Sequence, residues 1–367
     1  MKVCIVAGGT GGHIVPAIAV AEKIQGEKLF ITGRLRKAEE KFSKQIPGEV
    51  KFIDVRPIVG KGLSAIIGFI SVIPAVKQVL EIFKNFKPEV VIGFGGYVSG
   101  PVLLAGKLSG AKVFVFEQNS FMGFANKISS FFADKVLLSF PDAEIPSFAR
   151  KKSVHVGFPI RDKFKAELSS AMSLGKNSES INIFVTGGSQ GALSLNLLFL
   201  ETLKKIISSS KEIRKIKVFH QTGDISYFLV KEFYEREIFP LANKKGFSFD
   251  VEIFSFTDRM GYFIGVADLV ISRGGAGTVF EVAYAKKPAI FVPLPKSIGD
   301  HQFKNPLKLF RDACIIVRQE EKGRFEIIMS EILKKHTMLE EMKKRVEEEM
   351  KNIQIDGTEK IIDILKG

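Results

Sequence analysis

The amino-acid sequence predicts an α/β protein of two doubly wound domains, each built on a parallel sheet. Short β-branched runs alternate with longer helical patterns along the chain, which is the pattern of βαβ units. The 367 residues exceed what one hydrophobic core usually serves, so two domains are expected. Hydrophobic residues make up 46% and charged residues 26% of the chain, a composition typical of a folded globular protein.

A first series of strands is expected in the amino-terminal half. Apolar runs predict these strands at Lys2 to Ala7, Lys28 to Thr32, Val50 to Val55, Glu89 to Gly93, Lys112 to Phe116 and Lys135 to Leu138. Between them, Ile14 to Ile24 and Ser64 to Phe86 have the apolar spacing of helices. This alternation predicts the first doubly wound domain.

A second series begins after Ser169 to Ser180, a serine-rich stretch with little periodicity that predicts a linker or surface loop. Strands are then expected at Ile181 to Thr186, Lys217 to His220, Phe249 to Phe254, Leu269 to Ser272, Ala289 to Val292 and Ile315 to Val317. Met338 to Lys351 and Gly357 to Leu365 have the pattern of charged amphipathic helices. We expect a first domain at 1–160, a second at 161–340, and carboxyl-terminal helices at 341–367 that pack back on the first domain.

The net charge, the cysteine content and the apolar stretches limit which classes of protein this chain can belong to. The formal charge of +14, from 54 Lys and Arg against 40 Asp and Glu, favours partners that carry phosphate. With only two cysteines, no disulfide framework is expected, and a reducing cytoplasm fits this content. Met1 and Lys2 lead directly into a strand, so no signal peptide is expected. The longest apolar stretch, Ala65 to Val76, contains Pro74 and is shorter than the roughly 20 residues that span a bilayer. Any membrane association is therefore expected to be peripheral.

Three glycine-rich turns follow predicted strands and precede predicted helices: Gly8 to His13, Gly93 to Gly100, and Gly187 to Gly191. Glycine allows close backbone approach, and the start of the next helix offers N–H groups to a phosphate. Tight βα turns also use glycine for packing alone, so one such turn would be weak evidence. None of the three matches the P-loop pattern, and Thr32-Gly33-Arg34 lacks the acidic residue of a dinucleotide-binding domain.

A fourth turn, Ser272 to Thr278, is followed by Glu281 in the next predicted helix. A carboxylate at this place can accept hydrogen bonds from the two hydroxyls of a ribose. Further along, Asp300-His301-Gln302 stands at a predicted helix start. Amide and imidazole groups suit sugar hydroxyls, which both donate and accept. The turns together therefore favour a sugar nucleotide as ligand.

These motifs resemble those of the N-acetylglucosaminyltransferases of peptidoglycan synthesis, and the resemblance runs over nearly the whole chain. The residues that carry it are Gly8 to His13, Gly95 to Pro101, Glu117-Gln118-Asn119, Gly187 to Ala192 with Asn196, His220 to Gly223, Ser272 to Glu281, and Asp300-His301-Gln302. The resemblance implies the GT-B architecture, in which two Rossmann-like domains face a cleft. It also implies that the second domain holds UDP-N-acetylglucosamine (UDP-GlcNAc) and that the first holds the lipid-linked acceptor.

The reaction that the resemblance implies is an inverting transfer of GlcNAc from UDP-GlcNAc to the C4 hydroxyl of N-acetylmuramic acid in undecaprenyl-pyrophosphoryl-MurNAc-pentapeptide, which converts lipid I into lipid II. It implies a peripheral protein on the cytoplasmic side of an anionic membrane, with no cofactor. No D-x-D motif is present, and no metal is expected to be required. Nucleic acid is not an expected partner, because no nucleic-acid-binding motif is found.

His13 is the candidate catalytic base, because an imidazole with a pKa near ~6.5 suits proton removal from a hydroxyl at neutral pH. The resemblance places Ser189 and Gln190 at the diphosphate, Arg161 and Arg273 at the nucleotide end, Glu281 at the ribose and the backbone of Thr257 at uracil. It places Asn119, His301 and Gln302 at the GlcNAc group, and it adds Thr10, Gly11 and Gly12 to the donor contacts. The acceptor side is expected to comprise Tyr97, Ser99, Glu117 and Asn196, with Thr10 also facing it.

Three residues depart from the family pattern. Phe116 stands where many members have His, Phe158 replaces the Asn of a Gly-Asn-Pro pattern, and Gly274 stands where a larger small residue is common. Phe116 removes a polar candidate from the acceptor side, and Phe158 is compatible with repacking alone. No catalytic role is therefore expected at position 116.

The segment from Ile58 to Phe86 is an apolar cluster flanked by lysines. Basic edges with a shallow apolar face are typical of docking on anionic lipid. A core helix with a solvated lysine rim has the same pattern. Both interpretations stay open from the sequence.

Two other classes of function are considered. One is another UDP-sugar enzyme of the same architecture, either a glycolipid glycosyltransferase or a UDP-GlcNAc 2-epimerase; Gly96 to Gly100 and Glu117 to Asn119 favour the peptidoglycan enzyme instead. The other is a binding module for nucleotide sugars or nucleic acid without turnover. The nature of the labelled product formed from UDP-GlcNAc separates these classes.

Overall fold

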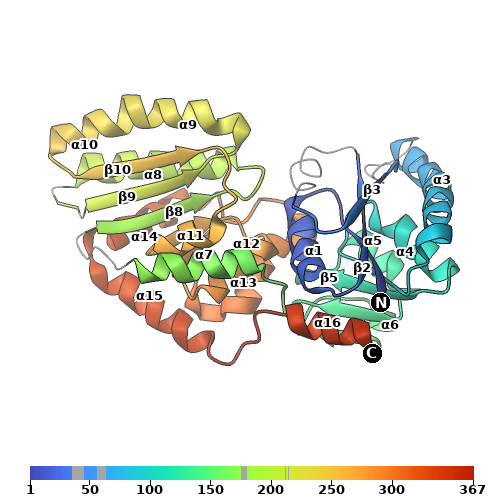
Figure 1. Cartoon of the computed structure of the whole chain (residues 1–367). Helices are drawn as coiled ribbons and strands as arrows, with labels where there is room; N and C mark the ends of the chain where they lie inside the picture. Colours follow the sequence, from blue (N-terminus) through green and yellow to red (C-terminus); the bar gives the residue numbers. More distant parts are fainter. Residues whose placement is uncertain (35–44, 56–62, 175–179, 211, 214) are drawn as a thin grey trace. The chain divides into compact units, whose positions relative to one another are not determined.

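A computed structural model of the chain describes residues 1–34, 45–55, 63–174, 180–210, 212–213 and 215–367. The chain divides into two compact units; in Figure 1 the first is coloured blue to green together with the red helix α16, and the second runs from green to red-orange. Unit 1 comprises Met1–Arg161 and Gln354–Gly367, and unit 2 comprises Asp162–Ile353. Each unit contains its own parallel sheet with helices packed against it, so the predicted fold class is confirmed.

Unit 1 is built on a seven-stranded sheet in the order β3-β2-β1-β4-β5-β6-β7, and all its pairs are parallel. The strands are β1 Lys2–Val6, β2 Glu27–Gly33, β3 Glu49–Ile53, β4 Val90–Gly93, β5 Lys112–Glu117, β6 Lys135–Leu138 and β7 Ser153–His155. The chain leaves β1 toward β2 and later returns to β4 on the other side of β1. The carboxyl ends of β1 and β4 therefore form the topological switch point, where ligands of such sheets bind.

The helices of unit 1 are α1 Gly11–Lys23, α3 Leu63–Phe86, α4 Ser99–Leu108, α5 Phe124–Ser129, α6 Ser147–Arg150 and α16 Thr358–Lys366. Cys4 and Val6 of β1 pack in one buried cluster with Val79 and Phe83 of α3. Helix α16 lies against α1, which brings the carboxyl-terminal segment into unit 1. Burial raises the pKa of the Cys4 thiol far above its ordinary value, so this cysteine acts as a core residue.

Unit 2 is built on a six-stranded sheet in the order β10-β9-β8-β11-β12-β13, again with parallel pairs throughout. The strands are β8 Ser180–Thr186, β9 Lys215–Gln221, β10 Phe249–Phe254, β11 Leu269–Ser272, β12 Ala289–Phe291 and β13 Ile315–Ile316. Here the switch point lies at the carboxyl ends of β8 and β11. The turns at Gly187 and Arg273 follow these two strands directly.

The helices of unit 2 are α7 Asp162–Ser173, α8 Leu193–Ser209, α9 Tyr227–Phe233, α10 Phe239–Lys245, α11 Met260–Val266, α12 Ala276–Tyr284, α13 His301–Phe310, α14 Lys322–Lys334 and α15 His336–Glu349. Short 3-10 segments lie at Asp224–Ser226, Ile298–Asp300 and Arg311–Ala313, and a π-helical turn lies at Tyr234–Ile238.

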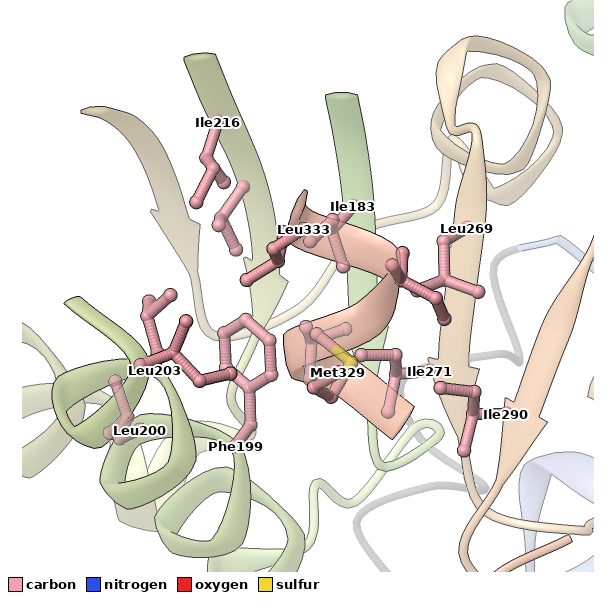
Figure 2. Packing of buried hydrophobic residues seen from close by; sticks show 14 of the residues in the cluster. Ile183, Phe199, Leu200, Leu203, Ile216, Leu269, Ile271, Ile290, Met329 and Leu333 are labelled. Atoms are coloured by element: carbon pink, nitrogen blue, oxygen red, sulfur yellow. The ribbon is translucent and has the colours of Figure 1, made fainter. Parts of the chain in front are cut away.

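Both faces of the unit 2 sheet are covered. Along β8, Ile183 faces the cluster formed with α8 and α14, whereas its neighbour Phe184 stacks on Phe263 of α11, with ring centroids 5.7 Å apart. Figure 2 shows side chains of α8 and α14 meeting those of the strands; the labelled residues are Ile183, Phe199, Leu200, Leu203, Ile216, Leu269, Ile271, Ile290, Met329 and Leu333. A strand buried on both faces needs apolar residues at every position, which explains the continuous apolar runs in the sequence.

The structure differs from the sequence-based prediction in three places. Residues 169–173 of the expected linker form the end of α7, and residues 175–179 lie outside the described chain. Strand β7 was not predicted, because three residues give no periodic signal. The carboxyl-terminal stretch is divided: α15 belongs to unit 2, and only Gln354–Gly367 belongs to unit 1. In the described part of the chain, no helix has the length and apolar character that a membrane crossing requires.

Candidate functional site

The switch point of unit 1 is formed by two glycine turns in direct backbone contact. A Cβ atom at Gly96 would lie 2.1 Å from the Gly8 carbonyl oxygen, and Gly96 has a φ of +85°. Phe94 extends this contact, because its N–H donates to the Val6 carbonyl at 2.8 Å. Any side chain at position 96 would separate the turns, so the sequence motif is needed for close approach.

His13 lies in the first turn of α1, directly above this contact, and is half-buried. Its Nδ1 atom is 2.9 Å from the Phe94 carbonyl oxygen and 2.7 Å from Nε2 of Gln118. A Cβ atom at Gly95 would lie 2.8 Å from the same Nδ1. The position of the ring is therefore fixed at Nδ1 by its contacts with the Phe94 carbonyl and Gln118.

Glu117, at the end of β5, is a buried carboxylate held by neutral donors. Its oxygens accept from the backbone N–H groups of Asn119 and Gly123, both at 3.0 Å, and from Nδ2 of Asn126 at 2.8 Å. Burial, the largest effect, raises the pKa of Glu117, and these hydrogen bonds oppose the rise. The carboxylate shapes the loop that carries Gln118 and Asn119.

The other residues expected around His13 lie at the same edge of the unit 1 sheet. Thr10 precedes α1 in an extended conformation, and Gly11 and Gly12 form the first turn of that helix. Tyr97 is half-buried, with its ring 3.8 Å from the position of a Cβ at Gly9. Asn119 is partly exposed at the end of β5. The structure thus brings Thr10, Gly11, Gly12, Tyr97 and Asn119 into one region.

Three further predicted ligand contacts, like Glu117, are buried in this structure. Ser99 is completely buried, and its hydroxyl donates to the Gly95 carbonyl at 2.7 Å, which closes the turn beneath His13. Arg161, the last residue of the first segment of unit 1, is 8% exposed, and its Nη1 donates to Oε1 of Gln45 at 3.2 Å. Asn196 is completely buried in unit 2. The side chains of Ser99 and Asn196 are not accessible to an acceptor in this structure.

The switch point of unit 2 has the same construction. Gly191 lies against Gly223, because a Cβ at Gly191 would be 2.3 Å from the Thr222 carbonyl oxygen. The Gly188 N–H donates to Oγ1 of Thr186, and the Gly188 carbonyl accepts from Nε2 of Gln221. Between these anchors, Ser189 is half-buried and Gln190 is exposed. The turn presents its polar residues at the carboxyl end of β8, where a diphosphate can bind.

A buried chain of hydrogen bonds supports this turn from below. The Tyr234 hydroxyl is 3.0 Å from Nδ1 of His220, whose Nε2 is 3.2 Å from Oδ1 of Asn196. Asn196 then donates through Nδ2 to the Thr222 carbonyl at 2.9 Å. Burial lowers the pKa of His220 to about 3, so the ring is neutral and carries one proton. Both ring nitrogens of His220 are satisfied when the Tyr234 hydroxyl donates to Nδ1 and Nε2–H donates to Oδ1 of Asn196.

Arg273 follows β11 and holds the neighbouring loops together. Its guanidinium donates to the carbonyls of Val292 and Pro293, to Oγ of Ser194 and to Oε1 of Gln319. Burial lowers the pKa of Arg273 to about 10, and the side chain remains a cation at neutral pH. All four of these acceptors are neutral, so a bound diphosphate would meet a positive charge that they do not cancel.

Gly274, one of the departures from the family pattern, is required by packing. A Cβ atom there would lie 1.7 Å from the Gln302 carbonyl oxygen, and Nδ2 of Asn305 donates to the Gly274 carbonyl at 3.0 Å. These contacts place the start of α13 beside the β11 turn. His301 and Gln302 are thereby brought next to Arg273.

The remaining predicted donor contacts lie in unit 2. Glu281 is buried in α12, and Thr257 is half-buried with its hydroxyl accepting from the Arg259 N–H. His301 is bonded through Nδ1 to the Ile298 carbonyl at 2.8 Å, which leaves Nε2 for a ligand. Gln302 accepts from the Leu294 N–H at 3.0 Å. In the described ranges, no three His, Cys, Asp or Glu side chains are grouped as metal ligands.

The other two departures from the family pattern contact each other. The ring centroids of Phe116 and Phe158 are 6.3 Å apart in an edge-to-face arrangement, and Phe94 lies 5.0 Å from Phe116. Phe116 and Phe158 are both fully buried. The two departures therefore belong to one apolar cluster with Phe94, and no local sequence pattern indicated that they were coupled.

Two family models match the chain: the glycosyltransferase family 28 N-terminal domain over residues 3–138 and the C-terminal domain over residues 182–362. The chain therefore belongs to glycosyltransferase family 28. A curated relative from Pseudoalteromonas translucida (strain TAC 125) is 35% identical over 347 residues, which cover 93% of this chain and 91% of the relative. That relative is named UDP-N-acetylglucosamine--N-acetylmuramyl-(pentapeptide) pyrophosphoryl-undecaprenol N-acetylglucosamine transferase. The resemblance drawn from the motifs is confirmed.

Solved structures agree with this assignment. The crystal structure of Acinetobacter baumannii MurG is similar with a TM-score of 0.74 and 26% identity, covering 100% of this chain and 99% of that one. The UDP-GlcNAc 2-epimerase from Neisseria meningitidis bound to UDP-GlcNAc gives a TM-score of 0.63 at 16% identity, with coverage of 100% and 99%. At that identity the epimerase shares the fold alone.

Sequence reasoning missed several residues that build the site. Asn126 and Gln319 stand outside every glycine motif, and nothing in the sequence pairs them with Glu117 or Arg273. Gln118 lies inside the Glu-Gln-Asn motif but was not assigned a role. Its position directly between two assigned residues was the one available signal.

Proposed function

We propose that this chain is an inverting N-acetylglucosaminyltransferase that moves GlcNAc from UDP-GlcNAc to the C4 hydroxyl of MurNAc in a polyprenyl-pyrophosphoryl-MurNAc-pentapeptide. The named relative at 35% identity over 93% of the chain supports the substrates. The observation that carries the mechanism is the half-buried His13, fixed through Nδ1 to the Phe94 carbonyl at a ligand-binding switch point. We propose that unit 1 binds the acceptor and that unit 2 binds the donor.

Donor binding is proposed at the carboxyl ends of β8 and β11. Ser189, Gln190 and the helix start behind them suit the diphosphate, with Arg273 supplying positive charge. Glu281 suits the ribose hydroxyls, and the backbone at Thr257 suits the base. His301 and Gln302 suit the GlcNAc hydroxyls because each is already held by one hydrogen bond and keeps a second polar atom.

In the proposed reaction, Nε2 of His13 takes the proton of the acceptor C4 hydroxyl while its oxygen forms a bond to the anomeric carbon. The bond from that carbon to the β-phosphate oxygen breaks, and UDP leaves with the electron pair. A single displacement inverts the anomeric centre and needs no covalent sugar intermediate. The N–H groups of the unit 2 turns and Arg273 stabilise the charge that grows on UDP. We propose that this stabilisation needs no metal, so chelation with EDTA should leave the rate unchanged.

The test of this function supplies radiolabelled UDP-GlcNAc and a lipid I analogue to the full chain. The expected product is a labelled β-linked disaccharide lipid. His13→Gln should lower kcat by about 100- to 10,000-fold, the usual contribution of a general base, with little change in KM for UDP-GlcNAc. Glu281→Gln should raise that KM and change kcat less. Labelled free GlcNAc or ManNAc as the dominant product would overturn the proposal in favour of a hydrolase or epimerase.

We also propose peripheral association with the cytoplasmic face of an anionic membrane. Residues 58–62 of the segment first considered, Ile58 to Phe86, lie outside the described chain, but unit 1 has a second apolar stripe. Phe124, Ile128 and Phe131, on and just after α5, are exposed by 59%, 41% and 65%. Their spacing places them on one side of the helix. Phe131 also stacks on the exposed ring of Phe148 at 4.0 Å. Lys127 is exposed on α5, and Nζ of Lys152 donates to the Phe131 carbonyl at 3.1 Å.

A vesicle sedimentation assay tests this association. The double variant Phe124→Ser/Phe131→Ser should bind less to vesicles with anionic lipid, because it removes apolar surface that enters the headgroup region. Ile327→Ser is the matched control, since Ile327 is exposed by 64% on α14 of unit 2. Equal binding of the double variant and the control would contradict a role for the α5 stripe.

A further inference from the structure

The surroundings of His13 Nδ1 contain a conflict between two neighbours. The Phe94 carbonyl oxygen, 2.9 Å away, can only accept a hydrogen bond. Nε2 of Gln118, 2.7 Å away, can only donate one. A neutral imidazole nitrogen either carries a proton or offers a lone pair, so Nδ1 cannot satisfy both neighbours.

The oxygen of the same side-chain amide is also unsatisfied. Oε1 of Gln118 is buried without a hydrogen-bond partner, and the residue is only 4% exposed. A buried carbonyl without a donor is unfavourable by about 1–3 kcal/mol. Rotation of the amide by a half turn exchanges its oxygen and nitrogen with almost no change in shape. The rotation places Oε1 against Nδ1 and removes the conflict with Phe94.

The Phe94 carbonyl decides between the two arrangements, because it cannot turn. The backbone is held on both sides of this carbonyl: the Phe94 N–H donates to the Val6 carbonyl at 2.8 Å, and the carbonyl of the next residue, Gly95, accepts from the Ser99 hydroxyl at 2.7 Å. Gly95, with a φ of +90°, continues the turn, and a Cβ atom there would lie 2.8 Å from Nδ1 of the ring. A fixed acceptor at Nδ1 requires a proton there, so the mobile amide has to present its oxygen.

We propose that Gln118 is a positioning residue that turns its side-chain carbonyl to His13 and, together with the Phe94 carbonyl, fixes the ring as the Nδ1-protonated tautomer. This proposal rests on the proposed function only for the role of His13 as base. In that tautomer Nε2 carries the lone pair and can remove a proton. After proton transfer, the Nδ1–H of the imidazolium is already bound by two oxygens, which stabilises the developing charge.

Glu117, the buried carboxylate that precedes Gln118 in the sequence, is hydrogen-bonded to other residues. Its oxygens accept hydrogen bonds from Asn119, Gly123 and Asn126. Asn126 also donates to the Phe116 carbonyl at 3.0 Å, which holds the strand end from which Gln118 projects. The neutral amide of Gln118 therefore faces Nδ1 from a loop that Glu117 and Asn126 keep in place.

The first experiment reads the tautomer in the free protein and needs no substrate. ¹⁵N NMR of the imidazole nitrogens is recorded above the titration range, and His13 is identified among the five histidines by its loss in His13→Gln. The expected result is a protonated Nδ1 and a lone pair on Nε2. A proton on Nε2 with a lone pair on Nδ1 would overturn the proposal, whatever reaction the chain catalyses.

The second experiment compares two replacements of Gln118 in the transfer assay. Gln118→Met keeps the length but removes the oxygen, and should lower kcat by about 10- to 100-fold, the effect of one hydrogen bond to a charged group. Gln118→Glu restores an oxygen, and its kcat should exceed that of the Met variant at least about tenfold. KM for UDP-GlcNAc should stay within about twofold in both variants. Equal loss in both variants, with a wild-type tautomer in both spectra, would also overturn the proposal.

Discussion

Acidification from pH 7 to pH 5 is expected to weaken unit 2 through His220. The ring is completely buried between Tyr234 and Asn196, and burial lowers its pKa to about 3. In the unfolded chain the same ring has a pKa of about 6.5. Below that value the unfolded state takes up a proton that the folded state does not bind, so folding loses free energy as the pH falls.

The magnitude follows from the two pKa values. The stability that the neutral ring contributes is complete above about pH 6.5 and falls by about 1.4 kcal/mol for each pH unit below it. At pH 5 the loss is about 2 kcal/mol, and the fall ends near pH 3, where the folded ring also binds a proton. Glu117 in unit 1 has a raised pKa and therefore acts in the opposite direction, so the two units must be followed separately.

The assay is urea unfolding at pH 7, 6 and 5, followed by pulsed hydrogen exchange and mass spectrometry of peptides from β8 and β9. These peptides report on unit 2 alone. His220→Gln is the comparison, because it keeps polar groups on both sides but does not titrate. Its stability at pH 7 should be lower than that of wild type, and the difference should shrink by about 2 kcal/mol at pH 5. Parallel curves for the two proteins would refute the reasoning.

Three further predictions follow from single contacts. Gly274→Ala should destabilise unit 2 by about 1–3 kcal/mol and raise KM for UDP-GlcNAc, because its Cβ would meet the Gln302 carbonyl at 1.7 Å; the adjacent Gly275→Ala, with nothing within 4 Å, is the control in the same melting and kinetic assays. Phe158→Asn should destabilise unit 1 by about 2–4 kcal/mol, and adding Phe116→His should cost less than the sum of the two single changes, since the rings touch; additive double-mutant energies would contradict a coupled pair. Asn126→Ala should cost about 1–3 kcal/mol and raise the pKa of Glu117 further, measured by ¹³C NMR of the carboxyl group, because its amide serves both Glu117 and the Phe116 carbonyl; an unchanged pKa would show that the amide does not stabilise the carboxylate.

Most of the fold could be predicted from local sequence. The strands other than β7, and the helices α1, α3, α15 and α16, were located to within a few residues, because strands buried on both faces are continuous apolar runs and these helices have helical apolar spacing. β7 has three residues and gave no signal. Residues 169–173 were assigned to a linker because serines dominate them, yet Phe164 and Leu168 bury one face of α7, and Ala171 extends that buried face into the serine-rich part.

The site was predicted at the level of motifs and only partly at the level of atoms. His13, Ser189 and Arg273 were assigned to the site because a glycine turn or a strand end marks each of them, and their roles stay predictions. Ser99 and Asn196 were assigned to an acceptor on motif alone, although both lie in the interior. A motif indicates that a residue is important. Whether its side chain can contact a ligand depends on its exposure in the folded protein.

Sequence by itself determined the parallel α/β class, the two-domain organisation, the family and the turns that carry the chemistry, because these depend on residue type and on spacing along one chain. Tertiary structure alone decided which partners each side chain has. The contact of Phe116 with Phe158, the support of Thr222 by His220 through Asn196, and the position of Gln118 against His13 all join residues from separate strands and loops. Such pairs depend on strand order and on the packing of segments that are far apart in the sequence. Local sequence periodicity predicts neither of these.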